Sequence, residues 1–226
     1  MRVRRFVQSL PLWAEFAFVL AAAQGMFVYS SIRVLLHGTR RLAETDAGQW
    51  LLATHEAIVF LLIGAFLRAR GWTLEHIGLI PGWRDTAIGI VLAGLVFAVD
   101  RGVYWAFYEL RSPVMHELMT VHLVYRPFTA VSVAMVVLMN PLYEEVFSAG
   151  YLITALKMRF HPAVTIAAGV VLRILYHLYQ GPISILHVVP LGVIFGLWYV
   201  RTGRLWPLVV AHAALDAFAL GHNVQL

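Results

Sequence analysis

Two adjacent carboxylates stand inside a long apolar stretch of this chain. Glu144 and Glu145 follow Asn140-Pro141 within a mostly apolar run from residue 128 to 156. Neighbouring carboxylates in a nonpolar environment lose hydration and repel each other, which favours proton uptake by one of them and suits general-base catalysis. We predict that Pro141 kinks this helix or begins a new one with Asn140 as its cap. Alternatively, the run is two helices with the glutamates at a wet interface between them.

Two further groups place histidine four residues from a charged side chain. Arg173 and His177 share one helix face, with Tyr176 beside them, and His212 and Asp216 share another. Each group also has a structural interpretation, as an interfacial helix end in the first case and as a His–Asp hydrogen bond in the second. Burying all these groups in one polar cavity costs less than placing each of them in lipid. Together they predict a hydrolytic site inside a membrane.

The elements that must position these residues are membrane-spanning helices. The chain has 226 residues, of which 61% are hydrophobic and only 13% charged, whereas soluble domains carry about 25% charged residues. A spanning helix needs about 20 apolar residues, and the continuous apolar runs favour helices over a barrel. We therefore predict an all-α bundle of about seven spans, with six to eight allowed: Leu12–Ile32, Trp50–Leu67, Thr86–Tyr108, Phe128–Leu156, Ala163–Tyr179, Ile183–Val200 and Leu205–Leu220.

The segments between these runs set the expected orientation. Three of them are predicted to be polar loops, namely 37–49, 68–85 and 110–126. Most of the loop arginines, together with the single lysine Lys157, fall on one side if the N-terminus is cytoplasmic. The first run resembles a signal peptide, but it continues beyond Ala21-Ala22-Ala23 and contains Glu15, so we expect a retained anchor. High arginine with little lysine suggests a GC-rich genome, and we expect a multi-pass protein of a bacterial inner membrane.

The polar groups, in this order, resemble the CPBP family, which includes type II CAAX prenyl endopeptidases and bacterial abortive-infection proteins. The family pattern is EExxxR, FxxxH and HxxxN or HxxxD on successive helices. The corresponding segments are Glu144-Glu145-Val146-Phe147-Ser148-Ala149, Arg173-Ile174-Leu175-Tyr176-His177 and His212-Ala213-Ala214-Leu215-Asp216. The resemblance divides one membrane domain, 1–226, into a motif-free part, 1–127, and a catalytic core, 128–220.

The resemblance implies an intramembrane peptidase that needs no metal or cofactor. Glu144 matches the glutamate that activates water, His177 the histidine that holds it, and Glu145 a supporting acid. His212 and Asp216 match the pair that stabilises the oxyanion. An ionised aspartate would repel an oxyanion, so Asp216 must either be protonated or orient His212.

Two positions depart from the family pattern. Ala149 replaces the family's arginine, and Arg173 replaces its usual phenylalanine. We hypothesise that Arg173 supplies the missing charge from the next helix. If it does not, the protein is a non-catalytic membrane partner or immunity protein.

Other function classes fit the sequence less well. A zinc peptidase would need HExxH, which neither His55-Glu56 nor His116-Glu117 continues to form. A proton-coupled transporter would use intramembrane acids, but the chain has no matching broken helices in two halves. The arginines punctuate apolar runs and form no polar stripe, so nucleic acid is not an expected partner. The expected partners are the lipid bilayer and a membrane-associated protein or peptide substrate.

Overall fold

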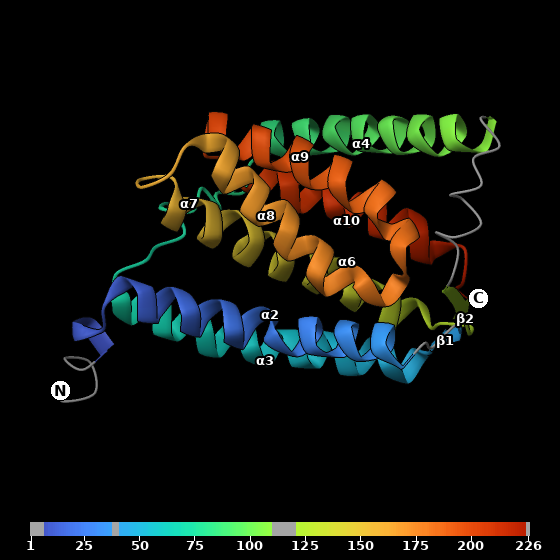
Figure 1. Ribbon diagram of the computed structural model, residues 1–226, viewed down its shortest axis with the longest axis horizontal. Coiled ribbons are helices and arrows are strands. Elements are labelled where there is room, and N and C mark those ends of the chain that lie inside the picture. Colours follow the sequence, from blue (N-terminus) through green and yellow to red (C-terminus); the bar gives the residue numbers. More distant parts are fainter. Residues whose placement is uncertain (1–6, 38–40, 110–120, 225–226) are drawn as a thin grey trace.

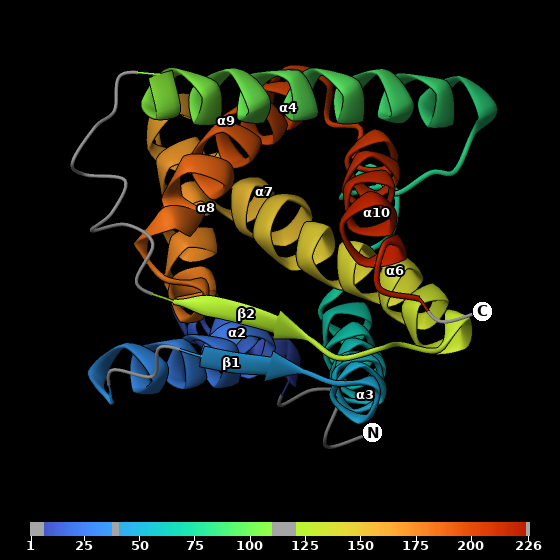
Figure 2. The ribbon, with the colours of Figure 1, turned by 90° about the vertical axis from the view of Figure 1, so that its right-hand side faces the viewer.

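The structure is a computed structural model that describes residues 7–37, 41–109 and 121–224. Its helices pack into one bundle in which several are inclined to one another (Figures 1 and 2). They are α2 (Leu12–Leu36), α3 (Asp46–Arg70), α4 (Trp83–Glu109), α6 (Ala130–Glu145), α7 (Leu152–Leu156), α8 (Pro162–His177), α9 (Ile185–Thr202) and α10 (Trp206–Gly221). The chain is thus an all-α bundle, as the apolar runs predicted.

Six helical segments of the described chain are long and apolar enough to cross a membrane. The seventh predicted span corresponds to α10, which is shorter but equally apolar. Large apolar side chains such as Trp13, Leu61 and Leu138 are exposed on the outer faces of their helices. An apolar exterior is what a bilayer requires, and the protein is an integral membrane protein.

Helices α6 and α8 form the middle of the bundle. Helix α6 packs against α3 on one side and α10 on the other, while α8 packs against α9 and α2. The α2–α3 pair therefore covers one flank of the centre, and α4, α9 and α10 cover the other (Figures 1 and 2). Close approach of α9 to α8 depends on a small residue, because a Cβ at Gly192 would lie 3.0 Å from the Val170 side chain.

A two-stranded parallel sheet occurs where the sequence predicted only polar loops. Strand β1 (Arg41–Glu44) pairs with β2 (His122–Tyr125), in the register Leu42 to Leu123. These strands tie the segment after α2 to the segment before α6, at one end of the bundle (Figure 2). The loop prediction for 37–49 and 110–126 missed them because four-residue strands give too short a pattern to detect. The rest of that second loop up to residue 120, including His116-Glu117, lies outside the described residues.

The starts of α3 and α6 are joined by their capping residues. Thr45 caps α3 by accepting from the Gly48 amide, and Thr129 caps α6 by accepting from the Ser132 amide. Asp46 then accepts a 2.8 Å hydrogen bond from the Thr129 amide. Satisfying exposed helix-end amides in this way fixes the two helix starts side by side.

The loop after α3 is fixed to the opposite end of the bundle. The Leu205 amide donates to the Gly78 carbonyl at 2.9 Å. Gly78 has a φ of +64°, and a Cβ there would lie 1.7 Å from the Gly203 carbonyl oxygen. Only glycine fits this close contact, so the loop is anchored on the α9–α10 turn.

Candidate active site

The glutamate pair lies near the end of an uninterrupted helix. Helix α6 runs through Pro141, and its N-cap is Thr129, so the prediction that Asn140 caps a new helix is wrong. The Asn140 side chain instead turns inward and donates to two carboxylates. Immediately after Glu145 the backbone widens into a π-helical segment, Val146–Tyr151. Such segments are often found at functional sites, where they alter the direction of neighbouring side chains.

Glu145 is the most deeply buried charged residue of the site. Its side chain is 0% exposed and forms an ion pair with Arg173. Its other oxygen lies 2.8 Å from Nδ1 of His212. Burying a carboxylate to this degree is costly unless both oxygens have partners, as they do here. Glu145 therefore connects α6 to α8 and α10.

Glu144 has a different set of partners and faces a cavity. It accepts hydrogen bonds from the Tyr176 hydroxyl at 2.8 Å and from Asn140 Nδ2 at 3.2 Å. Its carboxylate also lies 3.6 Å from Nη1 of Arg173. Each carboxylate oxygen can accept two hydrogen bonds, so Glu144 retains capacity for a water molecule. It lines a cavity of about 270 Å³ between α2, α3, α6 and α8.

Arg173 contacts both glutamates from the neighbouring helix. Its side chain is 4% exposed, and the guanidinium carbon lies 5.9 Å from the centre of the Phe195 ring. Ala149, where the family pattern has arginine, is 2% exposed among apolar side chains in the π-helical segment. The positive charge beside the glutamate pair thus comes from α8 in this chain.

His177 shares the cavity with Glu144 but does not contact it directly. Its Nδ1 lies 3.0 Å from the Arg173 carbonyl oxygen. A carbonyl only accepts, so Nδ1 carries the hydrogen, and in the neutral imidazole Nε2 keeps a free lone pair. The ring centroids of Tyr176 and His177 lie 4.6 Å apart. This contact holds the imidazole next to Tyr176, the residue that donates to Glu144.

His212 and Asp216 lie on the other side of the glutamate pair. Nε2 of His212 is 3.6 Å from the Asp216 carboxylate, which is longer than a hydrogen bond. Glu145, at 2.8 Å, is therefore the residue that orients His212. His212 and Asp216 line a second cavity, of about 320 Å³, together with Asp100 and His187. Glu144 lines the first cavity, and Glu145 contacts His212, which lines the second.

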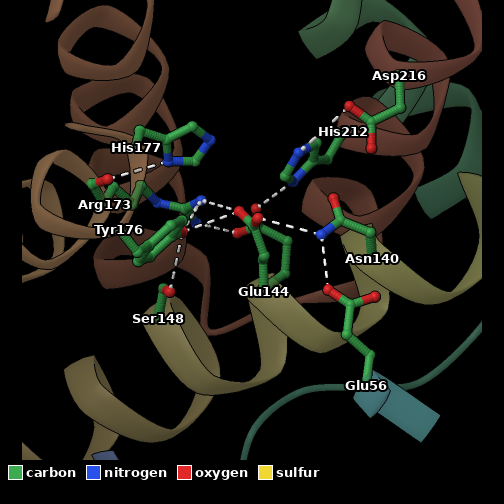
Figure 3. Close-up of polar contacts among 10 residues, drawn as sticks. Glu56, Asn140, Glu144, Ser148, Arg173, Tyr176, His177, His212 and Asp216 are labelled. Atoms are coloured by element: carbon green, nitrogen blue, oxygen red, sulfur yellow. Dashed lines mark hydrogen bonds and ion pairs between the residues drawn. The ribbon is translucent and has the colours of Figure 1, made fainter. Parts of the chain in front are cut away.

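Sequence reasoning missed one acid that belongs to this group. Glu56, on α3, is 1% exposed and accepts a 2.8 Å hydrogen bond from Asn140 Nδ2. Asn140 thus joins Glu56 to Glu144 (Figure 3). The available signal was a carboxylate inside a predicted span, which is costly in lipid and marks a functional position by default.

The described residues contain no group of three or more potential metal ligands. Glu145 and His212 satisfy each other, and Glu144 is held by Tyr176 and Asn140. The site is arranged as a hydrogen-bond network around a buried cation.

Fold and site together define a polytopic helical membrane protein with a buried glutamate–histidine centre. Residues 126–218 match the family described as Type II CAAX prenyl endopeptidase Rce1-like. The resemblance to the CPBP family is confirmed over this segment, which contains all five residues predicted to be catalytic. No curated protein and no solved structure matches the chain. The family match supports an intramembrane protease of the CAAX type as the kind of function.

Proposed function

We propose that the protein is an intramembrane endopeptidase that hydrolyses a peptide bond of a membrane-associated protein or peptide. The observation that supports this most directly is the shared cavity of Glu144 and His177. One offers a carboxylate with spare acceptor capacity and the other an imidazole lone pair, with no direct bond between them. A water molecule held by both would be ready for deprotonation.

Glu144 acts as the general base in this mechanism. The water oxygen forms a bond to the substrate carbonyl carbon while one water proton passes to Glu144. The carbon–nitrogen bond of the tetrahedral intermediate then breaks, and Glu144 returns the proton to the leaving nitrogen. Arg173 and Tyr176 keep the carboxylate in place through both steps. No covalent enzyme intermediate is needed.

His212 stabilises the oxyanion through Nε2–H. Glu145 holds the opposite nitrogen, Nδ1, and so fixes the direction of the imidazole. Asp216, in ion-pair range of Nε2, favours a proton on that nitrogen before substrate arrives. An oriented donor of this kind is worth about 10²–10³-fold in rate at an oxyanion site. Glu145 and Asp216 are thus positioning residues.

The wider assignment follows from the site and the arginine distribution. We propose a bacterial inner-membrane location with a cytoplasmic N-terminus, and a single membrane domain, 1–226, with the catalytic core in 128–220. Arg2, Arg4 and Arg5, which contribute to this orientation, lie outside the described residues. Fusing a reporter enzyme to each terminus would test the orientation, because reporter activity depends on the side of the membrane.

Glu144→Gln and His177→Gln test the proposed activity. The purified variants in lipid nanodiscs are incubated with solubilised membrane proteins from cells that lack the protein, and new peptide termini are identified by mass spectrometry. We expect Glu144→Gln to lower the yield of new termini about 10²–10⁴-fold. Glu75→Gln is the matched control, because Glu75 is an exposed loop residue. If both site variants gave the wild-type yield, the protein would be a non-catalytic membrane partner. Ala149 in place of the family's arginine would then explain why it has no activity.

A further inference from the structure

The cavity that contains Glu144 is lined by an unusual excess of acids. Glu44, Glu56 and Glu144 all line it, and the lining set includes no arginine or lysine. Arg173 compensates the charge of Glu144 from behind Tyr176. The carboxylates of Glu44 and Glu56 have no such cation among the described residues. Burial raises the pKa of the Glu44 carboxyl, at the end of β1.

Glu56 has a carboxylate oxygen without a partner. Oε1 accepts from Asn140, but Oε2 has no hydrogen-bond partner in the described part of the chain, although the residue is 1% exposed. Two other buried acids, Glu15 and Glu145, differ in this respect, because Glu15 pairs with Arg70 and Glu145 with Arg173. A buried carboxylate without a cation is costly, and the cost is recovered when a cation arrives.

The same cavity contains an unpartnered donor. Gln24, on α2, is 1% exposed, and its Nε2 has no hydrogen-bond partner among the described residues. An amide nitrogen donates to oxygen acceptors such as a peptide carbonyl. The cavity thus offers one free acceptor on an acid and one free donor on an amide. A peptide with a positively charged group satisfies both.

We propose that this cavity is a cation-recognition subsite, in which Glu56 binds an ammonium or guanidinium group and Gln24 donates to a carbonyl of the same peptide. The inference rests on the proposed endopeptidase function and deepens it. Because a single amide, that of Asn140, separates Glu56 from Glu144, the cation lies close to the bond that is cleaved. The charged group is either a lysine or arginine side chain or the α-ammonium of the substrate.

Binding of small matched ligands tests the subsite without requiring cleavage. Butylguanidinium and neutral butylurea have nearly the same shape, and leucinamide and acetyl-leucinamide differ in the α-ammonium. Each is titrated into the protein in nanodiscs while thermal unfolding is followed by tryptophan fluorescence, since a ligand of the folded state raises the midpoint. In one of the two pairs, we expect the charged ligand to reach half-saturation at a concentration about tenfold lower than the neutral ligand does. The pair that shows this preference identifies side chain or α-ammonium as the source.

Variants assign the preference to Glu56. Glu56→Gln keeps an acceptor for Asn140 but removes the charge, and we expect its preference ratio to fall to about one. Glu44→Gln is expected to lower the ratio partly and provides the test should Glu56→Gln not fold. Glu75→Gln, which lies outside this cavity, is expected to keep the preference. Equal affinity for charged and neutral members in the wild type, or an unchanged ratio in the Glu56 and Glu44 variants, would overturn the subsite.

Either assay, binding or cleavage, can give a negative result while the other gives a positive one. Cleavage that depends on Glu144 without any preference for charged ligands would leave the peptidase intact and remove the subsite. A preference that depends on Glu56 without cleavage would leave a cation site in a protein that is not a peptidase. When both hold, lysine, arginine or a free α-ammonium should be enriched next to the cleaved bonds of the wild type, and Glu56→Gln should lose this enrichment.

Discussion

Two clusters in this bundle each bury a glutamate against an arginine, and they differ in what surrounds the ion pair. In the first, Glu15 of α2 pairs with Arg70 of α3 and accepts from the Trp72 indole at 2.9 Å and the Tyr151 hydroxyl at 3.2 Å. Glu15 therefore has three donors that hold it. The cluster fixes the start of α2 to the end of α3.

In the second cluster, the ion pair of Glu145 and Arg173 supports groups with spare capacity. Glu144 can accept further hydrogen bonds, and His177 has a free nitrogen towards a cavity. A buried ion pair by itself is weak support for function, because it also occurs as structure. The second cluster differs from the structural pair by its adjacent imidazoles, its second acid and its cavity, and these are the features on which the proposed activity rests.

Removing the cation from each cluster should give the largest difference. Arg173→Met leaves Glu145 buried with His212 as its remaining partner, and we expect a loss of about 3–5 kcal/mol in the free energy of unfolding. Arg70→Met should cost less, because Trp72 and Tyr151 still donate to Glu15. Thermal or denaturant unfolding in nanodiscs measures both. Equal losses of unfolding free energy in the two variants would contradict the view that the second cluster depends more strongly on its arginine than the first does.

A second test moves the positive charge from residue 173 to residue 149, where the family has its arginine. Ala149 lies four residues after Glu145, so an arginine there can approach the pair from the π-helical segment that follows α6. Arg173→Met combined with Ala149→Arg is expected to regain about 1–2 kcal/mol of the loss, since Ala149 is enclosed by apolar neighbours that must shift. Ala149→Arg alone is the control and should destabilise. No recovery in the double variant would count against Arg173 as the replacement charge.

A smaller effect is expected at the edge of the site. Asp216→Asn keeps the size of the side chain and, at 3.6 Å from His212, breaks no hydrogen bond. We expect the cleavage rate to change by about tenfold or less, because Glu145 still orients the imidazole. Glu145→Gln, which weakens that orientation, should lower the rate more. A larger loss in the Asp216 variant would make Asp216 the positioning residue.

The smallest effect is expected from metal chelation. The described acids and histidines do not converge as metal ligands, so a chelator should leave cleavage within about twofold of its untreated value. The measurement is the yield of new termini before and after dialysis against the chelator, with zinc re-addition as control. Loss of cleavage that zinc restores would replace the general-base mechanism by a metal-dependent one.

The apolar runs determined most of the fold, because a bilayer requires continuous helices of a narrow range of lengths. All seven predicted spans correspond to helices, with boundaries that differ by a few residues. The short strands β1 and β2 were missed, since their pairing depends on segments about eighty residues apart. The capping role of Asn140 was predicted wrongly, because its actual partner Glu56 lies on a distant helix.

By itself, the sequence determined that this is a membrane bundle and predicted which residues carry its chemistry. Intramembrane acids and histidines stand out against an apolar background, and their spacing matches a known family pattern. Only the tertiary structure decided how they are combined: Arg173 between the two glutamates, Glu145 rather than Asp216 on His212, and Glu56 beside Glu144. Spacing along a helix fixes which side chains share a face, whereas contacts between helices depend on how the whole bundle packs.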